Sequence, residues 1–170
     1  MQIAQRLLLT ERELSLALGP RLIGTAVDSG SQSPVVGEVL RAAASDSAYR
    51  RFNARVLVTD EERPVTISML VLVFTDSSTA QRTFSSVAQA AHLRSQLDDV
   101  SVAVETVTAP SGLVSYWGFM QADNLIEIVT LDTVDPKDIS VAELRSLLTV
   151  AVQRIIQGRN AGNGTSNVPF

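Results

Sequence analysis

The chain contains no cysteine and only one histidine among its 170 residues. The absence of cysteine excludes disulfides, thiolate metal ligands and a cysteine nucleophile. A two-histidine metal site would need a second histidine, and a Ser-His-Asp triad would depend on His92 alone. Because His92 is predicted near the end of a helix, we interpret it as a surface residue rather than a general base.

Positive charge and long apolar runs are also scarce. The 14 basic residues are outnumbered by 18 acidic ones, which gives a net charge of −4. A nucleic-acid surface needs clustered positive charge, so this balance argues against one. The uninterrupted apolar runs are too short for a transmembrane helix. No glycine-rich dinucleotide or phosphate motif and no GxSxG occurs, so no cofactor is predicted.

What the chain does have is the size and hydrophobic content of one ordinary domain. Hydrophobic residues make up 45% of the sequence, enough to form a proper core. We predict one domain over residues 1–157 and a flexible tail over 158–170, where Gly and Asn are frequent. Met1–Arg6 does not resemble a signal peptide. We therefore expect a cytoplasmic protein, unless a targeting segment precedes residue 1 and places the domain in the envelope or outside the cell.

The most apolar stretch, Val65–Phe74, is rich in β-branched residues and predicts a central strand buried on both faces. A strand within Tyr49–Thr59 precedes it, and the polar segment Thr59–Pro64 has the length of a hairpin connection. A helix over Thr79–Leu97 is expected next, because apolar residues recur there at helical spacing. Together these segments predict β-β-α.

Three further strands are predicted at Val100–Thr108, Leu113–Gln121 and Leu125–Leu131, separated by short turns. A last helix is expected from Ser140, since Glu143 three residues later forms a capping box with it. The short turns favour antiparallel pairing.

The N-terminal region shows weaker signals. Thr10 and Glu13 form another capping box and predict a short helix, which Gly19-Pro20 ends. A loop over Thr25–Pro34 and a short helix over Val36–Ala44 are expected to follow. The fold class is therefore α+β: a mainly antiparallel twisted sheet of about five or six strands flanked by helices, in the order α-β-β-α-β-β-β-α.

Tyr116 and Trp117 are the leading candidates for a binding surface, because aromatic residues make up only 5% of the chain. Adjacent strand residues point to opposite faces, so at most one ring enters the helix-covered core and the other faces the opposite side. Gly118 beside them permits a close approach of a backbone or a ligand, or marks a bulge. Packing of both rings in the core remains the alternative.

Arg51 and Arg55 share one side of their strand, with Asn53 between them. The pair is a candidate cationic patch for an anionic ligand, because guanidinium groups pair well with carboxylates. A solvated sheet face with no ligand explains the same pattern.

Several acidic residues are candidates for other chemistry. Glu127 lies between two isoleucines in a strand, where burial would raise its pKa and suit acid–base work. The simpler interpretation places it near the solvated edge of its face, and Glu105 has the same two interpretations. Asp132, Asp135 and Asp138 offer oxygen ligands for Ca²⁺, but a solvated loop before a helix N-terminus accounts for them, and no metal site is predicted.

Several short segments carry a resemblance to a family. They are Leu7–Thr10 followed by Leu14, the Ala80 and Phe84 pair after a strand ending in Phe74, the Asp123-Asn124 turn, and Arg154-Ile155 in the last helix. Their order resembles small bacterial envelope proteins, many of them lipoproteins, with the PsbP/Mog1-type α+β sandwich. Ala109–Gly112 stands where many members carry a more acidic turn. The resemblance implies an exported domain with a binding or accessory role, and it implies no catalytic residues.

Three functions remain open. The first is a non-enzymatic envelope domain that recognises a protein partner or an apolar small molecule through the sheet face around Tyr116 and Trp117. The second is a small enzyme that uses a carboxylate such as Glu127. The third is a cytosolic assembly or chaperone-like subunit, or a homo-oligomer, with the C-terminal helix as its interface.

Overall fold

The structure is a computed structural model that describes residues 3–28, 35–97 and 99–163. The helices are α1 (Ile3–Leu7), α2 (Glu11–Leu18), the 3-10 turn η1 (Gly19–Arg21), α3 (Val35–Ala43), α4 (Ser77–Val87) and α5 (Val141–Asn163). The strands are β1 (Leu22–Val27), β2 (Asp46–Val58), β3 (Glu61–Val73), β4 (Leu93–Leu97), β5 (Val100–Thr108), β6 (Val114–Ala122) and β7 (Leu125–Thr133). None of the described helices is long and apolar enough to cross a membrane.

The strands form one antiparallel sheet in the order β1-β2-β3-β7-β6-β5-β4. The α+β class and the antiparallel pairing are confirmed, with seven strands instead of five or six. β2 and β3 form the predicted hairpin, in which Thr59 and Asp60 both have positive φ. Such a two-residue turn matches the twist of the paired strands.

The two additional strands are the edges of the sheet. β1 begins at Leu22, after the predicted helix end at Gly19-Pro20, and continues to Val27, so the predicted loop Thr25–Pro34 is wrong for Thr25–Val27; residues 29–34 of that loop lie outside the described residues. The predicted helix Thr79–Leu97 ends at Val87, and β4 occupies the last five residues of the predicted range, so that prediction is wrong beyond Val87. Both strands are largely exposed. Because edge strands are held mainly by backbone hydrogen bonds to one neighbour, their side chains show little hydrophobic pattern.

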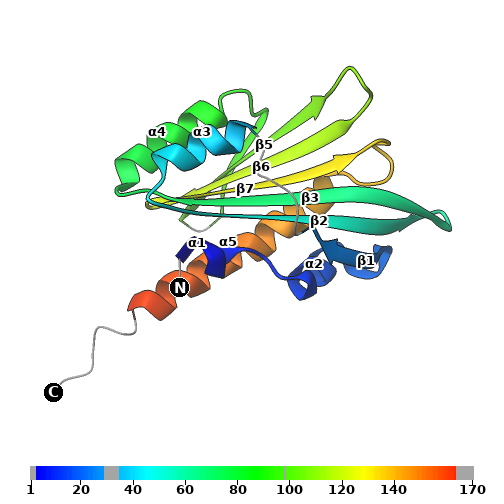
Figure 1. Ribbon diagram of the computed structural model, residues 1–170, viewed down its shortest axis with the longest axis horizontal. Coiled ribbons are helices and arrows are strands. Elements are labelled where there is room, and N and C mark those ends of the chain that lie inside the picture. Colours follow the sequence, from blue (N-terminus) through cyan, green and yellow to red (C-terminus); the bar gives the residue numbers. More distant parts are fainter. Residues whose placement is uncertain (1–2, 29–34, 98, 164–170) are drawn as a thin grey trace.

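Helices cover the sheet on both sides, as Figure 1 shows. α3 and α4 lie on one face, and α1, α2 and α5 lie on the other. Thr10 and Glu13 form the predicted capping box of α2, and the Ser140 amide donates to Glu143 at the start of α5. α5 continues to Asn163, beyond the end predicted at Gln157.

The face under α5 is closely packed. At Gly118 in β6, an added Cβ would lie 2.5 Å from a methyl carbon of Leu148 in α5. Glycine is therefore required here so that the helix can lie directly on the strand. This decides between the two interpretations of Gly118: the close approach is made by the protein's own helix.

Candidate binding groove

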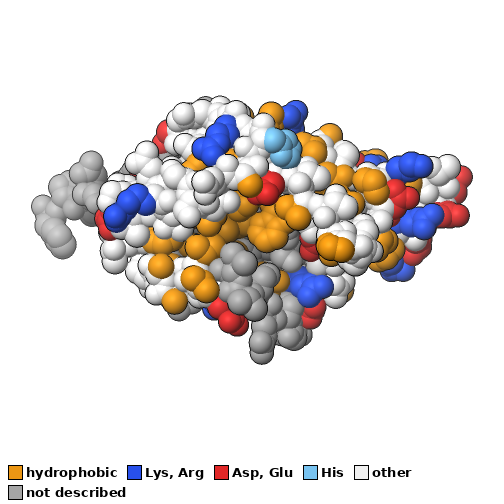
Figure 2. All heavy atoms as spheres, turned by 90° about the horizontal axis from the view of Figure 1, so that it is seen from above, with side chains coloured by type: hydrophobic (Ala, Val, Ile, Leu, Met, Phe, Trp, Pro, Cys, Tyr) orange, Lys and Arg blue, Asp and Glu red, His pale blue; other side chains and the backbone are white. Residues whose placement is uncertain are grey.

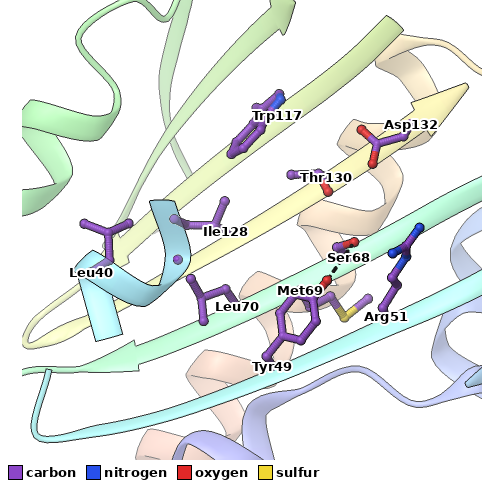
Figure 3. A pocket seen from close by; sticks show the side chains of 11 residues that line it. Leu40, Tyr49, Arg51, Ser68, Met69, Leu70, Trp117, Ile128, Thr130 and Asp132 are labelled. Atoms are coloured by element: carbon purple, nitrogen blue, oxygen red, sulfur yellow. Dashed lines mark hydrogen bonds between the residues drawn. The ribbon is translucent and has the colours of Figure 1, made fainter. Parts of the chain in front are cut away.

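Among the described residues, α3 and α4 cover only part of the face of the sheet on which they lie. Seen from that side, hydrophobic side chains gather in the middle of the molecular surface (Figure 2). A cavity of about 320 Å³ lies here between α3 and the sheet. Its lining comes from α3, β2, β3, β6 and β7, and consists of Gly37, Leu40, Tyr49, Arg51, Ser68, Met69, Leu70, Trp117, Ile128, Thr130 and Asp132 (Figure 3). We call this cavity the groove.

Strand register arranges the floor of the groove in rows that run across the sheet. One row is Tyr49, Leu70 and Ile128, which are successive pairing partners in β2, β3 and β7. Leu70 and Ile128 are buried, and Leu40 of α3 packs in the same cluster. This row and α3 form the apolar end of the groove.

The next row away from the helices is polar. Arg51 pairs with Ser68, Ser68 with Thr130, and Thr130 with Trp117. Side chains two residues apart in a strand point to the same face, so this row lies beside the apolar row. The Tyr49 hydroxyl donates to the Ser68 hydroxyl at 3.4 Å and connects the two rows. The groove therefore changes from apolar to hydrogen-bonding over a distance of two residues.

Two N–H groups in the polar row have no hydrogen-bond acceptor within the described part of the chain. They are Nε of Arg51 and Nε1 of Trp117, and both nitrogen atoms are buried. The nearest charged partner of Arg51 Nε is an Asp28 oxygen at 3.9 Å, beyond hydrogen-bond distance. A buried donor without an acceptor costs about 1–3 kcal/mol, so this arrangement favours a molecule that brings acceptors.

Asp132 stands one row further from the helices, and one of its oxygens accepts the Ser115 hydroxyl at 2.6 Å. Asp138 is instead buried and accepts from the Thr133 hydroxyl, while Asp135 accepts from the Lys137 amide. Within the described residues, no three His, Cys, Asp or Glu side chains are grouped so that they could hold a metal ion.

The leading candidates, Tyr116 and Trp117, point to opposite faces, as strand alternation predicts. Tyr116 is only 6% exposed and belongs to the core under α5, where burial raises the pKa of its hydroxyl. Trp117 is half-buried, lines the groove and stacks on Phe119 with ring centroids 6.0 Å apart. Only Trp117 is therefore placed where it can contact a ligand.

The candidate arginines are also separated. Arg51 lines the groove, while Arg55 pairs with Glu62 at 2.8 Å and is largely exposed near the β2–β3 hairpin. The structure does not bring the two guanidinium groups together in the groove. The predicted cationic patch reduces to a single arginine there, with Asp28 nearby.

Glu127 lies on the opposite face and is completely buried, so its expected position at a solvated edge is wrong. Neither carboxylate oxygen has a hydrogen-bond partner within the described residues. Burial raises the pKa of Glu127 to about 8; Arg154 of α5 opposes this shift and Glu13 of α2 adds to it. Arg154 and Glu13 form an ion pair with each other and join the two helices.

The other acid–base candidates also lie outside the groove lining. His92 is exposed in the segment between α4 and β4, not on a helix as predicted. Glu105 is half-buried and pairs with Trp117 across β5 and β6. The structure thus does not bring Glu127, His92 and Glu105 together.

Three of the groove residues with a hydroxyl group were not singled out from the sequence: Tyr49, Ser68 and Thr130. Ser68 and Thr130 each lie between two apolar residues of their strand, and they are direct pairing partners. A polar residue in the middle of a buried strand was the available signal. Its meaning required knowledge of which strands are neighbours.

No protein-family model and no curated protein matches the chain. Among solved structures, the fold is similar to that of the extracellular domain of PknH from Mycobacterium tuberculosis. The TM-score is 0.52 with 11% sequence identity, over 89% of this chain and 94% of that chain. At this identity the similarity shows a common fold. That fold therefore occurs in an extracellular bacterial domain.

Proposed function

We propose that this domain binds a small, partly apolar molecule in the groove and does so without catalysing a reaction. The observation that carries the proposal is the cavity of about 320 Å³, in which an apolar row and a polar row meet beside Trp117. Ligand sites are typically concave, with volumes of about 300–1,000 Å³ and a few polar groups on a mostly apolar lining.

A small molecule suits this surface better than a protein partner. The groove is concave and narrow, whereas a stable protein interface usually buries about 800 Å² on each partner. Glu127, the carboxylate considered for acid–base chemistry, lies outside the groove lining, and so does His92, which was interpreted from the sequence as a surface residue. This placement supports a binding role over the carboxylate enzyme.

We further propose that the domain works in the bacterial envelope. The support is the fold shared with an extracellular bacterial domain, together with the resemblance of the sequence segments to envelope lipoproteins of the PsbP/Mog1 type. The absence of cysteine is consistent with a role in the envelope, because a chain without cysteine tolerates both oxidising and reducing surroundings.

The proposal is tested with the uncharged fluorescent probe N-phenyl-1-naphthylamine. Trp117 is the only tryptophan in the chain, so energy transfer from its indole to the probe reports binding close to the groove. The informative variant is Leu40→Arg, which places a long charged side chain at the apolar end. Val39→Arg is the matched control, because Val39 is the preceding residue of α3 and is 70% exposed.

We expect saturable quenching of Trp117 fluorescence in the wild type and the Val39→Arg variant. The Leu40→Arg variant should bind the probe at least about tenfold more weakly, since a charge cannot be left unpaired on an apolar surface without cost. Equal binding by both variants, or binding that leaves Trp117 fluorescence unchanged, would contradict the proposal.

A further inference from the structure

We propose that the natural ligand of the groove is an uncharged amphiphile: an apolar chain joined to a head that is rich in hydroxyl or ester oxygens. This inference rests on the proposed function and adds the chemistry of the ligand. It follows from the order of side chains along the rows of the sheet.

The polar row defines the head group. Arg51, Ser68, Thr130 and Trp117 stand on four adjacent strands, β2, β3, β7 and β6. Neighbouring strands are about 4.8 Å apart, so the row presents hydrogen-bonding groups repeatedly across the width of the groove. A head that carries several oxygen atoms can meet such a row, whereas a single carbonyl group can meet only one position.

The unsatisfied atoms of the row determine which type of group is required. Within the described residues, the two buried side-chain atoms of the groove that have no partner are N–H donors, on Arg51 and Trp117. The hydroxyls of Ser68 and Thr130 can both donate and accept. The complementary head therefore supplies acceptor oxygens, and its own hydroxyl groups can donate in turn.

The charges around the row favour an uncharged head. The Arg51 side chain lies beside Asp28, with Nε and a carboxylate oxygen 3.9 Å apart. Asp132, the only carboxylate among the described residues that line the groove, accepts the Ser115 hydroxyl. An anionic head would approach both carboxylates, and a cationic head would approach the guanidinium group. Neither charge would meet a surface of clearly opposite sign.

The apolar row defines the other end of the ligand. Leu70 and Ile128 are buried in the floor beside Leu40, on the side of the polar row that faces α3 (Figure 3). An aliphatic chain placed on this row removes its own apolar surface from water, which favours binding. The ligand is thus oriented with its chain toward α3 and its head on the row from Arg51 to Trp117.

The test compares probes that share an eight-carbon chain and differ in the head. Octyl β-glucoside and 1-monooctanoylglycerol carry uncharged hydroxyl-rich heads, octanoate is anionic, and octyltrimethylammonium is cationic. Each is titrated below its critical micelle concentration, with Trp117 fluorescence and calorimetry as readouts. At least one uncharged probe should bind about tenfold or more tightly than both charged ones.

The Thr130→Val variant removes one hydroxyl from the row with little change of shape. We expect the preferred uncharged probe to bind it about two- to tenfold more weakly, while N-phenyl-1-naphthylamine binds as it does to the wild type. Thr106→Val is the matched control, because Thr106 is exposed and pairs with Tyr116, which faces the opposite side of the sheet.

The two proposals fail in different ways. If N-phenyl-1-naphthylamine binds with the expected dependence on Leu40 but octanoate or octyltrimethylammonium equals or exceeds the uncharged probes, the inference about the head is wrong and the binding function stands. Equal loss of affinity in Thr130→Val and Thr106→Val would also overturn the inference. If none of these probes binds, both proposals fail.

Discussion

The two faces of the sheet are built from the same strands and have opposite properties. On the face under α1, α2 and α5, apolar residues of β2, β3, β6 and β7 are buried along most of their length. On the other face, α3 and α4 cover one end of the strands, and the groove lies where this cover stops. A polar side chain has a different consequence on each face.

Glu127 and Thr130 show the difference within a single strand. Glu127 points to the face under α1, α2 and α5, which we call the closed face. There its carboxyl group is fully buried and has no hydrogen-bond partner among the described residues. Thr130 points to the groove, where its hydroxyl can meet a ligand. A polar residue in a strand is therefore a candidate for ligand contact only on the face that helices leave open. On the closed face, a buried polar residue without a hydrogen bond lowers the stability of the folded protein.

The largest expected effect comes from the pKa of Glu127. In the folded protein the Glu127 carboxyl group keeps its proton up to about pH 8, whereas the ordinary pKa of a glutamate side chain is 4.5. Between these values the folded state binds more protons than the unfolded state, so stability falls as pH rises. The full loss, reached above pH 8, is on the order of 5 kcal/mol.

Urea unfolding between pH 5 and pH 9 measures this loss. Glu13 and Glu143 have lowered pKa values, so their contribution to stability is complete before pH 5 is reached. The free energy of unfolding of the Glu127→Gln variant should be nearly independent of pH in this window. At pH 9 the variant should be more stable than the wild type. A wild type whose stability is flat across the window would show that Glu127 ionises without cost.

The second effect tests how closely α5 lies on the closed face. Gly118→Ala should destabilise the protein by roughly 1–3 kcal/mol, because the added methyl group overlaps Leu148. In a Leu148→Ala background the same substitution should be almost neutral. Gly24→Ala is the control, since its Cβ would meet only the end of the Arg55 side chain at 3.4 Å. Equal costs at Gly118 in both backgrounds would rule out the contact with Leu148 as the cause.

The smallest effect separates the two arginines that the sequence could not distinguish. Arg55→Ala removes an exposed pair with Glu62 and should change the free energy of unfolding by less than about 0.5 kcal/mol. It should leave probe binding unchanged, while Arg51→Ala weakens binding of the uncharged octyl probes. Weaker probe binding in Arg55→Ala would extend the functional surface beyond the groove toward the hairpin.

Much of the fold was predictable because local signals and tertiary structure agree. β5 begins at Val100 and ends at Thr108 as predicted, and the capping boxes at Thr10 and Ser140 mark the starts of α2 and α5. The failure at β4 has a local cause. Leu93 and Leu97 are spaced by four residues, which continues the helical pattern of α4, and only pairing with β5 makes this segment a strand.

The groove was less predictable than the fold. Alternation along β6 required Tyr116 and Trp117 to face opposite sides, but it did not show which side is open. That depends on α3 and α5, which are distant in the sequence. The same holds for Arg51 and Arg55, which share a face, although only Arg51 lies in the row that forms the groove.

By itself, the sequence determined the α+β class, the antiparallel hairpins and the assignment of alternate residues to opposite faces, because propensity, turns and periodicity act over a few residues. Tertiary structure decided the strand order, and with it the row of Arg51, Ser68, Thr130 and Trp117. It also decided that Glu127 is buried and Trp117 is accessible. These outcomes depend on which helix covers which face, and burial of a side chain is a property of its neighbours in space.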